Sequence, residues 1–228
     1  MKYQFPYADF DPMEIPDRQL VGVYSIRADG PRLDAKRLVA EALASPMGSP
    51  RLKDRVRPGM RVLIVVDDNT RTTRTEWMLP AVMAELSAAG LAASDIQVFV
   101  AIGTHRAMTR AEMEQKYTPG RVARHRFIQP NWHNTDEYVA VGTSGDFPIR
   151  IHRDLLQSDF VIGVGQTIPH LIAGFGGGCK IINPGCADPG TIGRMHWLGS
   201  TAEDGHLFAV RDNPVRRVID EVGLKAGL

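Results

Sequence analysis

The stretch Arg61–Asp68, with the sequence RVLIVVDD, decides the fold. Its aliphatic residues are continuous over the length of a strand, and the run ends in two acidic residues. A strand with this pattern is buried on both faces, as happens in a parallel sheet that is covered by helices on each side. We therefore expect a parallel strand over 61–68.

Further strands and helices alternate along the chain. The apolar runs at 95–103 and 158–165 predict two more buried strands. Between the first two strands lies 75–90, whose apolar residues recur with helical spacing; Gly90 is expected to end this helix, and Pro80 is early enough to be tolerated. Alternation of this kind predicts an α/β fold, a Rossmann-like, mainly parallel sheet with flanking helices.

Two helix starts are marked by capping residues. Thr109 and Glu112 have the spacing of a capping box. Near the end of the chain, Asn213 is expected as an N-cap, with Pro214 in the first helical position and Gly223 as the end of the helix. The less regular middle of the chain predicts two short strands, at 138–142 and 147–152.

The composition is that of an ordinary globular protein. The 228 residues are 43% hydrophobic and 23% charged, and we expect residues 1–228 to form a single α/β domain. A net charge of +1 offers no electrostatic case for nucleic acid or an anionic membrane as a partner. The apolar runs are too short to span a bilayer, and the first residues do not resemble a secretory signal. Since two cysteines make no disulfide scaffold, a cytoplasmic location is predicted.

Polar motifs follow three of the predicted strands. DDNTRTTR (67–74) follows the first, GTHR (103–106) the second and GQTIPHLIAGFGGGCK (165–180) the third. In open parallel sheets, ligands bind beyond the carboxyl ends of the strands. We therefore expect an active site at that edge of the sheet, where the three motifs converge.

The glycine-rich motif GFGGGCK (174–180) fits neither common phosphate loop. A Walker loop needs Gly before its lysine and Ser or Thr after it, whereas Cys179 and Ile181 flank Lys180. A dinucleotide fingerprint fails because Cys179 or Ile168 stands where its third glycine belongs. One interpretation is a plain turn with a solvated lysine. The other is that apolar surroundings lower the pKa of Lys180, and a neutral lysine can carry a covalent cofactor.

Three of the seven histidines are candidates for chemistry. His105 follows one predicted strand and His170 another, so the two can serve as an acid–base pair, although either alone is more typical of a core or capping residue. His196 is either a lone metal ligand or a residue buried beside Trp197. No two histidines have the spacing of a structural zinc site.

The motif after the first strand has two interpretations. Asp68 can accept hydrogen bonds from ribose hydroxyls, and Arg71 or Arg74 can bind a phosphate or carboxylate with its two-pronged guanidinium group. Alternatively, the segment is a surface loop whose arginines are solvated. The motif alone does not decide between these interpretations.

Together, DDNTR, GTHR and PHLIAGFGGGCKIINPGCADPGTIGRMH resemble the amino-terminal domain of the nickel-pincer lactate racemases and related 2-hydroxy-acid racemases and epimerases. The resemblance runs from about residue 15 to the end of the chain. In that family a histidine lies ten residues before the cofactor-bearing lysine and another sixteen after it, and His170, Lys180 and His196 reproduce both intervals.

The resemblance implies a role for each of these residues. Lys180 would form a thioamide with a pyridinium mononucleotide whose two sulfur-bearing arms and ring carbon hold nickel as a pincer, and His196 would be the fourth nickel ligand. His105 and His170 would be the two catalytic bases. Asp68 and Arg71 would lie near the cofactor and substrate. The glycines, Gly176, Gly177 and Gly178, would let the backbone approach the mononucleotide phosphate.

The activity that the resemblance implies is racemisation or epimerisation of a small 2-hydroxy acid by hydride transfer to the cofactor. Two alternatives stay open: a non-catalytic nucleotide-binding half that needs a partner, or a nickel-free hydrolase or isomerase that uses His105, His170 and Asp68. Relatives continue into a second domain, so a second domain or subunit is expected to complete the site. Asn69 stands where many relatives have histidine, and Cys179 has no role that we can assign.

Overall fold

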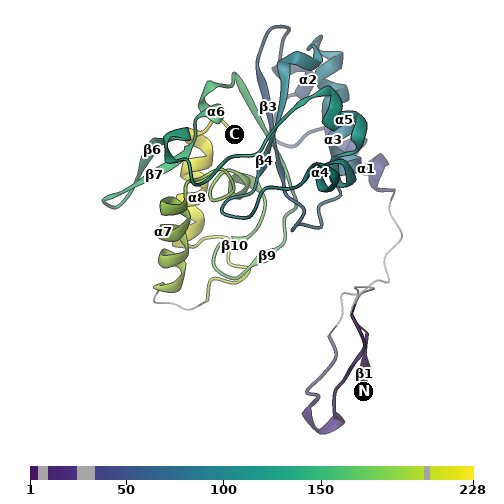
Figure 1. The fold of residues 1–228 in the computed structure, drawn as a ribbon, viewed down its shortest axis with the longest axis vertical. Coiled ribbons are helices and arrows are strands. Elements are labelled where there is room, and N and C mark those ends of the chain that lie inside the picture. The colour runs from purple at the N-terminus through teal and green to yellow at the C-terminus, as the bar shows by residue number, and fades with distance from the viewer. Residues whose placement is uncertain (5–9, 25–33, 203–205) are drawn as a thin grey trace. The chain divides into compact units, whose positions relative to one another are not determined.

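The computed structural model describes residues 1–4, 10–24, 34–202 and 206–228. They form two compact units, Met1–Asp34 and Ala35–Leu228. In the first unit, β1 (Lys2–Tyr3) pairs with β2 (Met13–Glu14) in an antiparallel ladder (Figure 1). The predicted site residues all belong to the second unit. That the whole chain serves as one cofactor-binding domain stays a prediction.

The second unit is built on a four-stranded parallel sheet. Its strand order is β5-β4-β3-β8, so that β3 is hydrogen-bonded on both sides. Val62 of β3 is in register with Ile96 of β4 and Phe160 of β8. The sheet confirms the predicted α/β class and contains the three predicted strands, β3 (Val62–Asp67), β4 (Ile96–Ala101) and β8 (Phe160–Val164), with β5 (Arg126–Ile128) as the fourth. The strands β3 and β4 are buried as expected, whereas β8 lies at an edge of the sheet and only its Val161 and Val164 are buried.

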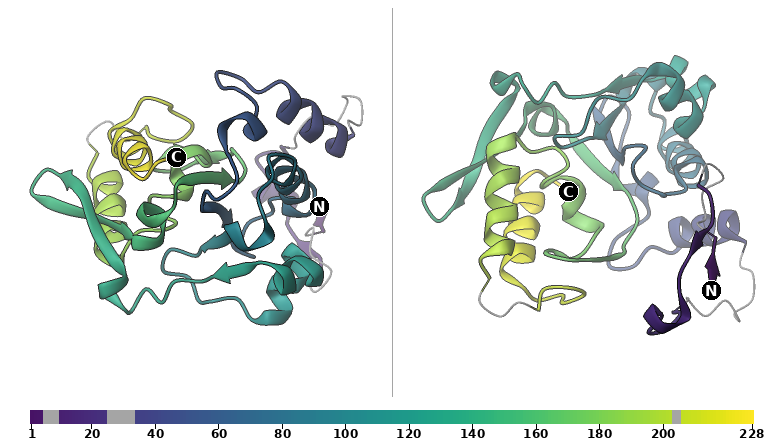
Figure 2. Two further views of the ribbon diagram at one scale, coloured as in Figure 1. Left: turned by 90° about the horizontal axis from the view of Figure 1, so that it is seen from above. Right: turned by 60° about the horizontal axis from the view of Figure 1, so that its bottom comes forward.

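Helices cover both faces of this sheet. Figure 2 shows α3 and the pair α7–α8 on opposite sides of it. The α-helices of the second unit are α1 (Ala35–Ala44), α2 (Leu52–Arg55), α3 (Thr75–Ala88), α4 (Arg110–Tyr117), α5 (Pro119–Arg124), α6 (Arg153–Gln157), α7 (Pro189–Ser200) and α8 (Pro214–Lys225). None of the helices in the described ranges is long and apolar enough to cross a membrane.

Shorter elements complete the unit. The predicted strands at 138–142 and 147–152 form an antiparallel hairpin, and the first of them extends further than expected. The remaining elements are β6 (Tyr138–Ser144), β7 (Phe147–His152), β9 (Pro169–His170), β10 (Gly174–Phe175) and the single 3-10 turns η2 (Ala93–Asp95), η3 (Thr135–Glu137) and η4 (Gly178–Ile181).

Strand β3 divides the core into two layers. Val62, Ile64 and Val66 pack toward α3, α4 and α5, while Leu63 and Val65 pack toward the β6–β7 hairpin, α7 and α8. All five side chains are buried, because successive residues of a strand point to opposite faces. Because both faces of β3 are covered, residues 62–66 are all aliphatic.

All but one of the predicted helix signals are confirmed, including Gly90 after the end of α3 and Pro214 at the start of α8. Thr109 and Glu112 form the capping box of α4, and the side chain of Asn213 accepts a hydrogen bond from the backbone of Arg216 at the start of α8. Gly223 does not end α8, which continues to Lys225. Glycine is needed there because α8 passes close to Cys179: a Cβ added at Gly223 would lie 2.3 Å from the Cβ of Cys179.

This contact predicts that Gly223→Ala destabilises the protein. In an unobstructed helix the change would add about 1 kcal/mol of stability. Here the added methyl group collides with Cys179, and we expect a net loss of about 1–3 kcal/mol in the free energy of unfolding. Urea denaturation measures the change. Gly193→Ala in α7 is the matched control, because no atom lies within 4 Å of its added Cβ; equal stabilisation of both variants would contradict the assignment.

Candidate active site

A cavity of about 190 Å³ lies at the carboxyl ends of the strands, where the three polar motifs were expected to converge. Most of the residues predicted from the sequence line it together: Arg71, His105, His170, Gly176, Gly177, Lys180 and His196. Asp68 lies behind His105 and contacts it directly. Gly178 lines a neighbouring cavity instead, and Arg74 pairs with Glu76 and stacks on Trp77.

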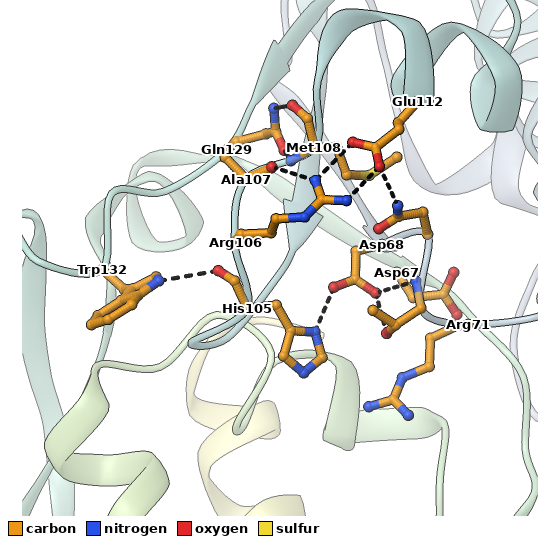
Figure 3. A network of polar contacts seen from close by, with 12 residues as sticks. Asp67, Asp68, Arg71, His105, Arg106, Ala107, Met108, Glu112, Gln129 and Trp132 are labelled. Atoms are coloured by element: carbon orange, nitrogen blue, oxygen red, sulfur yellow. Dashed lines mark hydrogen bonds and ion pairs between the residues drawn. The ribbon is translucent and has the colours of Figure 1, made fainter.

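Asp68 and His105 form a hydrogen-bonded pair (Figure 3). Asp68 directly follows β3 and is only 2% exposed; its Oδ1 accepts hydrogen bonds from the backbone and hydroxyl of Thr70. Its Oδ2 lies 2.6 Å from Nδ1 of His105. A carboxylate is an acceptor, so it selects the tautomer of His105 that carries the proton on Nδ1 and leaves a lone pair on Nε2.

His170 is held in the opposite tautomer. Its Nδ1 accepts hydrogen bonds from the backbone N–H groups of Ile172 and Ala173, at 3.3 and 3.2 Å. The proton of the neutral ring is therefore on Nε2. Burial, with smaller contributions from the charges of Lys180, Arg71 and His196, lowers the pKa of His170 to about 4. At neutral pH the cavity thus contains one imidazole set to accept a proton and one set to donate a hydrogen bond.

Lys180 sits half-buried in η4. Burial first, then the charges of Arg71 and Arg216, lower its pKa to about 8. No carboxylate in the described part of the chain forms an ion pair with it. About a tenth of the molecules would then have a neutral amine at pH 7, against less than one in a thousand for an ordinary lysine. This agrees with the expectation that apolar surroundings make Lys180 a nucleophile.

His196 presents one free ring nitrogen. It lies on α7, and its Nδ1 is 2.8 Å from the carbonyl oxygen of Ile192. Donation to a backbone carbonyl leaves Nε2 free as a ligand, which is the usual arrangement of a metal-binding histidine. Within the described ranges, no three His, Cys, Asp or Glu side chains are placed to hold a metal ion together.

The glycine loop brings backbone close to the cavity. Gly177 has a φ of 72°, and a Cβ there would lie 2.6 Å from the hydroxyl of Thr167. The loop is supported by Arg216 of α8, which donates hydrogen bonds to the carbonyl oxygens of Phe175 and Gly177. Sequence reasoning missed Arg216, because it lies far along the chain and nothing in its local sequence points to the loop.

The family model of the lactate racemase N-terminal domain matches residues 9–206. The lactate racemase of Thermoanaerobacterium thermosaccharolyticum is 28% identical over 220 residues, which cover 94% of this chain and 51% of that protein. The lactate racemase of Lactiplantibacillus plantarum is 28% identical over 168 residues, covering 72% of this chain and 39% of that protein.

Solved structures give the same relationship. The lactate racemase apoprotein from Thermoanaerobacterium thermosaccharolyticum superposes with a TM-score of 0.82 at 25% identity, covering 100% of this chain and 54% of that one. A protein from Thermotoga maritima superposes with a TM-score of 0.65 at 28% identity, covering 83% of this chain and 46% of that one. The chain thus spans about half the length of the relatives that it matches.

The charges around Lys180 predict its reactivity. Its acylation rate is expected to reach half its maximum near pH 8, because the neutral amine is the reacting form and its pKa is lowered. Arg71→Met removes one of the responsible charges and is expected to move the midpoint upward. Arg74→Met is the control, since Arg74 lies outside the cavity. Peptide mass spectrometry after limited labelling measures each rate; a midpoint near that of ordinary lysines would refute the assignment.

Proposed function

Because this chain belongs to the family of the lactate racemase N-terminal domain, we propose that it is the cofactor-holding half of an isomerase that racemises or epimerises a small 2-hydroxy acid. One observation carries the proposal. A single cavity joins a lysine of lowered pKa, a glycine loop and three imidazoles, each with a defined tautomer. The two free cysteines, Cys179 and Cys186, suit a reducing compartment, and we propose the cytoplasm.

The residues of the cavity fit a nickel-pincer pyridinium mononucleotide. Lys180 would anchor it through its amine, the backbone of Gly176 and Gly177 would approach its phosphate, and Nε2 of His196 would bind nickel. Gly178 would act through the shape of the loop, since it does not line this cavity. When bound, such a cofactor supplies an acceptor for the hydride on the carbon that bears the substrate hydroxyl.

The remaining side chains would orient the substrate and move its hydroxyl proton. The guanidinium of Arg71 suits the carboxylate of a 2-hydroxy acid. His105 would take the hydroxyl proton on Nε2, and Asp68 would stabilise the imidazolium that results. On the other side, Nε2–H of His170 would donate a hydrogen bond to the substrate oxygen. If His170 is charged, its lowered pKa makes it a strong acid toward that oxygen.

The assignment of Lys180 and His196 is tested by mass and metal content. Protein produced together with enzymes that make the pincer cofactor is expected to gain the mass of that cofactor at Lys180 and to retain nickel. Lys180→Arg should lose both, whereas His196→Ala should keep the added mass and lose nickel. Lys225→Arg, which changes an exposed lysine of α8, is the control. Unmodified Lys180 in the wild-type protein would refute the proposal.

Catalysis is tested by adding the part of a relative that this chain does not match. The chain spans about half of its relatives, so we expect loss of optical activity from L-lactate only after the loaded chain is mixed with the carboxyl-terminal half of a lactate racemase. His105→Gln should lower the rate about 10²–10⁴-fold, because it removes the base.

Two outcomes would favour the alternatives. Binding of the cofactor without turnover in any mixture would indicate a non-catalytic binding half. Full turnover by unmodified, nickel-free chain would indicate a different isomerase or hydrolase that uses the Asp68–His105 pair.

A further inference from the structure

Helix α4 lies outside the cavity, yet one of its faces contacts two of the three loops that carry polar residues of the site, the loop after β3 and the loop after β4. We propose that Glu112 and Lys116 on this face are positioning residues, which set Arg71 and the Asp68–His105 pair at a fixed spacing. The two residues are four apart and therefore lie on the same side of the helix. The expected effect on catalysis rests on the proposed function, whereas the contacts of Glu112 and Lys116 do not depend on it.

Glu112 joins the immediate neighbours of Asp68 and His105 (Figure 3). Its carboxylate accepts a hydrogen bond from Nδ2 of Asn69 at 3.0 Å and two from Arg106, at 2.5 and 2.8 Å. Asn69 follows Asp68 in the chain, and Arg106 follows His105. One carboxylate thus links the loop after β3 to the loop after β4 at the residues next to the hydrogen-bonded pair.

Glu112 is ionised at neutral pH and well below it. Hydrogen bonds from Arg106 and from the backbone of Thr109 lower its pKa to about 2. This charged carboxylate is the group through which Asn69 contacts helix α4.

Lys116 holds the same loop one turn further along α4. Its side chain is 10% exposed, and its Nζ donates a hydrogen bond to the carbonyl oxygen of Arg71 at 2.9 Å. The same Nζ lies 3.3 Å from Oδ1 of Asp67, whose other oxygen accepts a hydrogen bond from the hydroxyl of Thr73. One ammonium group thus contacts both the carbonyl oxygen of Arg71 and the side chain of Asp67, which in turn binds Thr73 on the far side of Arg71.

Trp132 also holds the loop that carries His105. The indole N–H of Trp132 donates a hydrogen bond to the carbonyl oxygen of His105 at 3.1 Å. Trp132 fluorescence therefore reports the position of this loop. Since Arg106 is largely exposed and makes its ion pair at the surface, losing that pair is expected to move the loop without opening the core.

The test compares Glu112→Gln with Glu114→Gln in the cofactor-free chain. Glutamine preserves the capping box of α4 but weakens the charged bonds to Arg106. Glu114 pairs with Arg110 on the same helix and contacts neither loop, which makes it the matched control. The measurements are the ¹⁵N imidazole spectrum of His105, Trp132 fluorescence and the urea midpoint.

We expect Glu112→Gln to broaden or shift the His105 signals away from a single Nδ1–H tautomer and to change Trp132 fluorescence, with a urea midpoint close to that of the control. Arg106→Gln removes the same contact from the other side and should give the same spectrum. In the assembled, loaded enzyme, Glu112→Gln should lower kcat about 10-fold or more through misplacement of His105.

Unchanged His105 spectra in both Glu112→Gln and Arg106→Gln would overturn the inference, as would an equal change in Glu114→Gln. Failure of the proposed function is a separate result. It would appear as an unmodified Lys180 in the wild-type chain, whatever the spectrum of His105 shows.

Discussion

The pairing of β3 with strands on both of its sides is the constraint on which the site depends. β4 and β8 run parallel to β3 and in register with it, so all three strands end at the same edge of the sheet. Asp68 follows β3 directly, and His105 follows β4 within a few residues. Their 2.6 Å contact is therefore a consequence of strand register. The glycine loop reaches the same cavity because it follows β8.

The cavity collects positive charge without an acidic partner for Lys180. Arg71, Arg216 and Lys180 lie near one another, and burial removes much of the water that would screen them. Burial is the main reason why the pKa values of Lys180 and His170 are lowered, and the neighbouring positive charges lower them further. The same field favours ligands with phosphate or carboxylate groups. The charges that contribute to the lowered pKa of Lys180 would therefore also attract a ligand of the proposed class.

The sequence was sufficient wherever a local signal determined the structure. Continuous aliphatic runs identified β3, β4 and β8, and the capping box identified the start of α4. Residues that lie together at the edge of the sheet could be predicted because parallel topology implies it. Predictions from the sequence failed where the structure is determined by a contact between distant parts of the chain. Gly223 looks like a helix stop, and only the contact with Cys179 shows why it is glycine.

Arg216 and Lys116 were missed for the same reason. Each is a surface-type residue on a helix, and each acts by binding main-chain oxygens of a loop far away in sequence. Such bonds leave no pattern in the sequence of the helix. The role of Cys179 is clearer from the structure, since burial raises the pKa of its thiol and its side chain packs against α8. It is suited to packing rather than to reaction as a thiolate.

The two histidines of the proposed mechanism are unequal, and a racemase can accommodate this. The Nδ1 of His105 contacts the carboxylate of Asp68, whereas the Nδ1 of His170 accepts hydrogen bonds from backbone N–H groups and burial lowers the pKa of His170. The equilibrium between two enantiomers is a property of the substrates in solution, so unequal bases leave it unchanged. The inequality affects which proton transfer is slow in each direction. In the proposed mechanism, His105, which lines the cavity and contacts the buried Asp68, would therefore be better placed to remove the hydroxyl proton, and His170 would be better placed to hold the substrate oxygen.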